Sequence, residues 1–132
     1  MRTLYKIKKG LDLTLKGEAT EQLTSATQSA EYAVMPTDFP GIVPRAMVKE
    51  GDSVLAGQTL FVDKATERIH FVSPVSGTIV GVERGERRKL LRFRVKANET
   101  QEFKNFDVKN LAQASADDVK NILLESGIFA FM

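Results

Sequence analysis

"VKEGDSVLAGQTLFVDKATERIHFVSPVSGTIVGV", from Val48 to Val82, carries the strongest fold signal in this chain. Short runs of β-branched and aromatic residues alternate in it with glycine, proline and charged residues, a pattern typical of strands joined by turns. Such runs occupy residues 59–63, 68–73, 78–83 and, just beyond the stretch, 90–97. Their spacing of about ten residues predicts a sandwich or a small barrel.

The residues before this stretch predict edges and turns. Residues 31–36 read as a strand that Pro36 ends, and residues 36–52 hold too many prolines for a central strand, because proline cannot donate a ladder hydrogen bond. Residues 18–30 are polar and predict a loop. Further upstream, apolar and charged residues alternate on both sides of Gly10, which predicts a pair of short N-terminal strands.

The C-terminal segment changes from the period of a strand to that of a helix. Val119, Ile122 and Leu123 share one helical face, Ser115 is placed as N-cap with Asp118 three positions on, and Gly127 is placed just past the helix end. The chain then ends on the apolar residues "IFAFM". We expect this run either to dock back onto the sheet or to continue in a longer natural chain.

Composition excludes several kinds of chemistry. The 132 residues contain no cysteine, which removes disulfides, thiolate nucleophiles and cysteine-ligated metals. His70 is the only histidine; it alternates with Ile69 and Phe71 and is expected to be a surface strand residue, not a metal ligand or catalytic base. The sequence has no glycine-rich phosphate loop, so with the points above no catalytic, cofactor-binding or metal residue is predicted. Charges interrupt every apolar run, so we expect no signal peptide and no membrane-spanning segment in these residues.

The distribution of charge carries the best functional information. Residues 84–96 hold seven basic residues and one acidic residue, whereas residues 99–125 hold three basic and six acidic ones. The change of sign predicts a domain edge, with one domain at 1–100 and a helical segment at 101–132 that starts the next domain. Nucleic acid fits this pattern poorly, because the net charge is only +2 and few aromatic residues are interleaved.

The basic run itself predicts a docking surface for an acidic partner, including the acidic residues 99–125 of this same chain, with an ordinary solvated strand face as the alternative. Within it, the residues at 91, 93 and 95 are expected to share the buried face of a strand, by its two-residue period. The candidate docking residues are Arg84, Arg87 and Arg88, which are expected at a hairpin turn with Lys89, and Arg92 and Arg94, which are expected on the opposite strand face.

A weak internal repeat links the two halves of the β region. Pro40, Val48, Gly51 and Asp52 recur at one fixed offset as Pro74, Val82, Gly85 and Glu86. A glycine before an acidic residue can take a positive φ in a turn. Two such units related by a pseudo-twofold axis give two small facing sheets over roughly residues 31–98, the arrangement called a barrel-sandwich hybrid.

The same stretch resembles the biotinyl and lipoyl carrier fold. The matching residues are Val48, Gly51, Asp52, Val54, Gly57, Gln58 and Leu60, followed by Pro74 and Gly77. In carriers a modified lysine lies where the hairpin reverses, but here Thr66 and Glu67 occupy that position. Lys64 comes about three positions early, on the outgoing strand. The resemblance therefore implies the scaffold without the prosthetic arm, with a lipoylated or biotinylated carrier as the alternative.

More of the chain is similar to the N-terminal part of the A subunit of Na⁺-translocating NADH:quinone oxidoreductases. The motifs that carry this resemblance are "KKGLD" (Lys8, Lys9, Gly10, Leu11, Asp12) and "ERGERR" (Glu83, Arg84, Gly85, Arg87, Arg88). The resemblance implies a mainly β barrel-sandwich hybrid with an N-terminal strand pair and a C-terminal helix, in a chain truncated before a Rossmann-like region. The C subunit of the related Rnf electron-transport complex and a plain adaptor domain are the alternatives.

The resemblance also implies where the protein works. It points to a peripheral component on the cytoplasmic side of the bacterial inner membrane, bound to the other subunits of the complex. NADH, flavins and quinone are implied for the whole complex and none of them for this piece. This piece is expected to be a docking module without catalytic activity of its own.

Overall fold

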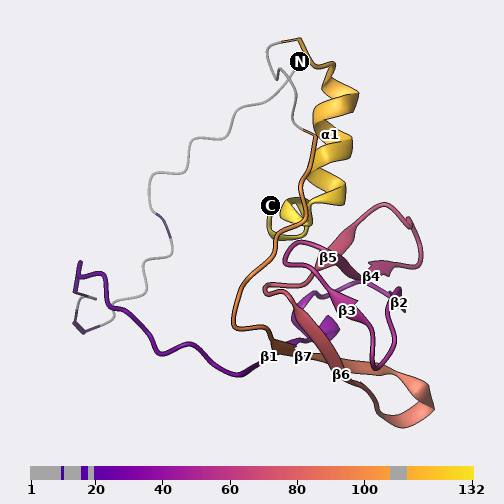
Figure 1. Cartoon of the computed structure of the whole chain (residues 1–132). Helices are drawn as coiled ribbons and strands as arrows, with labels where there is room; N and C mark the ends of the chain where they lie inside the picture. The colour runs from indigo at the N-terminus through magenta and orange to yellow at the C-terminus, as the bar shows by residue number, and fades with distance from the viewer. Residues whose placement is uncertain (1–9, 11–15, 18–19, 108–112) are drawn as a thin grey trace.

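The computed structural model describes residues 10, 16–17, 20–107 and 113–132 (Figure 1). The strand pair predicted around Gly10 falls largely outside the described residues. Residues 20–30 are exposed and form no helix or strand, which confirms the predicted loop over that range.

The described strands form two antiparallel sheets. The first has the order β1 (Glu31–Val34), β7 (Leu90–Ala97), β6 (Gly77–Arg84), β3 (Ser53–Val54). The second has the order β2 (Pro44–Ala46), β4 (Thr59–Asp63), β5 (His70–Val72). The strands predicted from the alternating pattern are therefore present, with small differences at their ends.

The prolines lie where a missing N–H does no harm. Pro36 opens the 3₁₀ helix η1 (Pro36–Asp38), and Pro44 begins β2, an edge strand of the three-stranded sheet. This confirms the prediction that residues 36–52 form turns and edges and contribute no central strand.

Three phenylalanine rings join the two sheets. Phe61 of β4 stacks on Phe71 of β5 at a centroid distance of 4.6 Å and on Phe93 of β7 at 5.2 Å. Phe61 and Phe93 are fully buried. Because Phe93 belongs to the four-stranded sheet and the other two rings to the three-stranded one, the sheets face each other across a shared core. This arrangement confirms the predicted barrel-sandwich hybrid.

One part of the strand prediction is wrong. The two-residue period places Leu91 on the buried face with Phe93 and Val95, but its side chain is 38% exposed, and Leu90 is buried instead. The pairing of β7 with β6 shifts by one residue at this point, so Leu91 is the extra residue of a β-bulge. Because of the bulge, Leu90 faces the core and Leu91 faces outward.

The C-terminal helix forms as predicted. Helix α1 (Ala116–Glu125) begins at Ser115, whose side chain accepts a hydrogen bond from the Asp118 N–H while the Asp118 carboxylate accepts one from the Ser115 N–H. This is a complete capping box. Gly127 follows the helix with φ of 79°, the left-handed conformation that glycine adopts most easily. No helix among the described residues is long and apolar enough to cross a bilayer.

The segment after residue 100 contacts the barrel at several points. The Ala56 N–H donates to the carbonyl of Glu102 and the Lys104 N–H to the carbonyl of Ala56, at 2.9 and 2.8 Å. Lys104 also forms an ion pair with Glu125 of α1 at 2.8 Å. In Figure 1 this segment runs up beside α1, which rises from the barrel near β5. A domain boundary at residues 100–101 stays a prediction.

Candidate functional site

The turn between β4 and β5 is the place where a carrier domain would hold its modified lysine. Asp63, at the end of β4, accepts hydrogen bonds from the backbone N–H of Val43 at 3.1 Å and from the N–H and hydroxyl of Thr66. The Val43 hydrogen bond is the largest cause of the lowered pKa of Asp63, with those from Ala65 and Thr66 adding to it against the opposing effect of burial. The turn is therefore fixed by a carboxylate.

The residues that the turn presents are not those of a carrier. Glu67 stands at the reversal with φ of 54° and forms an ion pair with Arg45 of β2. Lys64 is the first residue after β4, one position beyond the outgoing strand to which the sequence pattern assigns it, and its N–H donates to the carbonyl of Val43 at 2.7 Å. The reversal therefore presents a carboxylate, and the nearest amine in the turn lies at its start.

The hairpin of β6 and β7 carries the five arginines predicted to form a docking surface. Two of them lie on the sheet and are balanced by acidic neighbours. Arg92 Nε lies 2.6 Å from a carboxylate oxygen of Glu83, and Arg94 lies 3.5 Å from Glu83 and 3.6 Å from Glu31 of β1. Such exposed pairs add little stability, but they reduce the charge that these arginines offer to a partner.

The other three arginines belong to the hairpin tip, residues 84–89. Arg84 donates to the carbonyl of Arg88 at 3.2 Å, and among the described residues no acidic side chain pairs with Arg87, Arg88 or Lys89. Glu86 is the one acidic residue of the tip and is exposed. The structure thus brings unpaired positive charge together at the tip and leaves the rest of the predicted strip neutralised.

The backbone of the tip differs from the expectation for Gly85. Gly85 is extended, with φ of −97°, and the left-handed residues are Arg87 and Arg88, with φ of 52° and 61°. The Gly85 N–H donates to the carbonyl of Lys89, so the chain reverses on the residues between them. A non-glycine residue in this conformation costs about 1–2 kcal/mol.

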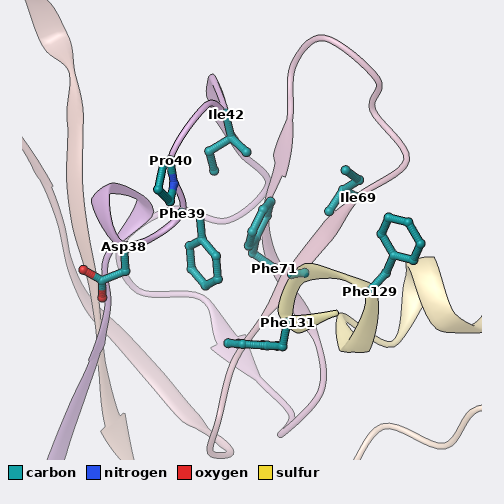
Figure 2. A pocket seen from close by; sticks show the side chains of 9 residues that line it. Asp38, Phe39, Pro40, Ile42, Ile69, Phe71, Phe129 and Phe131 are labelled. Carbon is teal, nitrogen blue, oxygen red and sulfur yellow. The ribbon is translucent and has the colours of Figure 1, made fainter. Parts of the chain in front are cut away.

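An apolar pocket of about 460 Å³ lies between the proline-rich segment, β5 and the 3₁₀ helix η3 (Ile128–Phe131). Phe39 packs against Phe71 at a centroid distance of 4.6 Å and against Phe131 at 5.5 Å. Figure 2 shows these three rings gathered around the hollow, with the Asp38 carboxylate pointing away from it. Asp38 is the one titratable residue of an otherwise apolar lining, so the pocket suits an apolar group.

Sequence reasoning missed this pocket as a site. Docking of the apolar C-terminal run onto the sheet was one of two alternatives left open by the sequence; in the structure Ala130 packs against the core and Phe131 reaches Phe39. A sequence signal for this pocket was Phe39, an aromatic residue directly before Pro40 in the proline-rich segment. The pocket itself could not be predicted from it, because the lining residues come from three separate parts of the chain.

His70 is the first residue of β5, as expected for a strand residue, and it is partly buried; it lines a hollow together with Asn121, Leu124 and Glu125 of α1. Its Nδ1 lies 2.9 Å from the Thr59 hydroxyl, and its pKa is lowered mainly by burial, with Glu125 opposing and Lys104 adding to the shift. Within residues 20–107 and 113–132, no three histidine or acidic side chains are grouped so as to hold a metal ion.

The comparisons with known proteins agree with each other. Residues 5–98 match the family described as the NqrA N-terminal barrel-sandwich hybrid domain. The chain is 38% identical over 128 residues to the A subunit of the Na(+)-translocating NADH-quinone reductase of Marinomonas sp. (strain MWYL1), an overlap of 96% of this chain and 29% of that protein. It is 36% identical over 128 residues to the corresponding protein of Neisseria meningitidis serogroup A, again over 96% of this chain and 29% of the relative. The chain thus spans less than a third of these relatives.

Proposed function

The chain belongs to the family of NqrA N-terminal barrel-sandwich hybrid domains, and from this premise we propose that it is part of the A subunit of a sodium-pumping NADH:quinone reductase. In such a complex, electrons pass from NADH to quinone and drive Na⁺ out of the cell. We assign to this part of the complex a peripheral position on the cytoplasmic side of the membrane. Its role there is to hold neighbouring subunits together, without a covalent cofactor.

The observation that carries this proposal is the similarity to A subunits of these reductases along 96% of the chain. The presence of Glu67 at the β4–β5 reversal, where a carrier has its lysine, supports the scaffold role. The unpaired cations of the hairpin tip support contact with a neighbour, because such charge speeds encounter with an acidic surface and orients it. NADH, flavin and quinone chemistry is assigned to other parts of the complex.

The assembly role is tested on the natural protein that contains this chain, tagged and purified from membranes in mild detergent. We expect it to co-purify with other subunits and with Na⁺-stimulated NADH oxidation. Arg87→Glu/Arg88→Glu is expected to lower the yield of the assembled complex. Full assembly of this variant, or a tagged protein that is recovered only alone, contradicts the proposal.

The scaffold role is tested separately by intact mass. We expect no lipoyl or biotinyl addition when the chain is co-expressed with the corresponding ligase and cofactor, because the acceptor position holds Glu67. A carrier domain expressed in parallel shows that the ligase is active. An added mass that disappears in Lys64→Arg rules out the scaffold interpretation and favours the carrier.

A further inference from the structure

A second, smaller hollow adjoins the basic hairpin tip. It has a volume of about 240 Å³, and its exposed lining is more polar than apolar. Lys89 of the tip lines it together with Leu90 of β7 and residues of the proline-rich segment, namely Pro36, Thr37, Phe39, Pro40, Gly41, Ile42 and Pro44. Phe39, Pro40 and Ile42 also line the larger pocket of Figure 2. The two hollows are therefore neighbours that share these three residues, and the smaller one lies between the larger, apolar pocket and Lys89 of the tip.

The walls of this surface are pre-shaped. Pro36 is buried, and the three prolines fix the backbone of the segment that carries Phe39. A surface that is already ordered loses little conformational freedom when a partner binds. Phe39 is itself held in place by its contacts with Phe61, Phe71 and Phe131.

The exposed cations of the hairpin tip favour a negatively charged partner. Arg87, Arg88 and Lys89 are exposed and have no acidic partner among the described residues, whereas Arg92 and Arg94 are neutralised on the sheet. Within this hairpin, an acidic partner therefore finds unbalanced positive charge at the tip and not on the sheet, and Lys89 of the tip also lines the hollow. Apolar and charged recognition therefore meet at one place.

We propose that the hairpin tip, this proline-lined hollow and the apolar pocket beside it form one docking surface for a peptide segment that carries acidic residues next to an apolar or aromatic side chain. The inference rests on the proposed function, since the segment belongs to a neighbouring subunit. The acidic residues pair with Arg87, Arg88 and Lys89, and the apolar side chain enters the larger pocket beside Phe39. The docking surface is thus narrower than the run from Arg84 to Arg94.

The test measures binding of defined peptides to the 132-residue chain by fluorescence anisotropy. The probe is a short fluorescein-labelled peptide in which glutamates flank a pair of phenylalanines; one comparison peptide replaces the glutamates by serine and another replaces the phenylalanines. We expect the full probe alone to bind, and to bind more weakly as salt is raised. Arg87→Glu/Arg88→Glu should weaken binding by about tenfold or more.

Two further variants separate the parts of the surface. Thr37→Glu adds a negative charge to the wall of the hollow and is expected to weaken binding without touching the tip. Lys64→Glu/Lys120→Glu changes the net charge by the same amount as the arginine variant, at exposed positions outside this surface, and is expected to leave binding unchanged. Circular dichroism of each variant verifies that the fold is retained.

Several outcomes overturn the proposal. They are equal binding of the probe without phenylalanine, equal weakening by Lys64→Glu/Lys120→Glu, and tight binding to phosphatidylserine vesicles that the probe peptide does not compete away. Failure of peptide binding in a protein that still co-purifies with the reductase refutes this inference and leaves the proposed function intact. Specific peptide binding without co-purification refutes the proposed function instead.

Discussion

Gly77, at the start of β6, lies where no side chain fits, and its replacement by alanine is the sharpest test of the fold. A Cβ atom at this position would lie 2.0 Å from the carbonyl oxygen and 2.8 Å from the carbonyl carbon of Lys96 in β7. Real Cβ contacts are essentially never below 3.0 Å, so the two strands would have to separate by about 1 Å. The obstacle is the backbone of β7 where its end pairs with the start of β6, and backbone cannot rotate away as a side chain can.

The expected loss follows from that overlap. Overpacking a core costs typically 1–3 kcal/mol when side chains can adjust, so a clash with backbone should cost about 3 kcal/mol or more. That is a large share of the roughly 5–15 kcal/mol that stabilises a domain, and it corresponds to a fall in Tm of about 10 °C or more. The free energy of unfolding is measured by urea denaturation followed by far-UV circular dichroism.

Two glycines of the same hairpin provide matched controls. At Gly81 the nearest atom to an added Cβ is Arg94 Nε at 3.6 Å, an ordinary contact, so Gly81→Ala should stay within about 1 kcal/mol of the parent protein. At Gly85 the nearest atom is Cδ1 of Leu91 at 3.0 Å, and this partly exposed side chain can move. The expected order of loss is therefore Gly77, then Gly85, then Gly81. A Gly77→Ala variant as stable as Gly81→Ala would refute the pairing of β6 with β7.

Three other substitutions address pH dependence and the helix end. Asp63 has a lowered pKa in the folded chain, so its stabilising effect is present above the unfolded pKa of 3.8 and is lost as the pH falls through the folded value. Asp63→Asn should therefore lower the free energy of unfolding at pH 7 and make it depend less on pH in acid, as measured by denaturation at about pH 7 and below about pH 4. His70 also has a lowered pKa in the folded chain, so the unfolded chain binds more protons and stability should fall as the pH drops below 6.5. His70→Gln should remove this part of the pH dependence. An unchanged slope of the free energy of unfolding against pH would contradict the partly buried position of His70 beside α1. Gly127→Ala combines a φ of 79° with a Cβ atom 2.9 Å from the Val72 side chain, so it should lower the free energy of unfolding by about 2 kcal/mol, whereas Ser126→Ala should lower it less. Equal losses of unfolding free energy for the two variants, measured by urea denaturation, would contradict this packing.

Local signals in the sequence were enough for much of the fold. The strands at residues 59–63 and 90–97 follow from their composition and spacing, and the edge position of Pro44 follows from its missing N–H. The capping box of Ser115 and Asp118 is likewise a contact within one turn of chain. These features depend on residues close together in sequence, so a pattern can reveal them.

The candidate site was only partly predictable. The sequence placed Arg84, Arg87 and Arg88 at a turn, and the structure agrees, but it could not show that Arg92 and Arg94 are balanced by acidic neighbours. Glu31, one of those neighbours, is distant in sequence and reaches Arg94 only because β1 pairs with β7. Which charges remain free is therefore decided by the register of the strands.

The sequence alone predicted four features of this chain: its β character, its edges bounded by proline, its capped helix and the absence of a lysine at the β4–β5 reversal. Three features required the packed molecule: Leu91 bulges outward, His70 lines a hollow beside α1, and Phe39, Phe71 and Phe131 surround an apolar pocket. The difference is one of range. Propensity, capping and turn chemistry act between near neighbours, whereas burial, ion pairing and pocket shape arise where distant segments pack together.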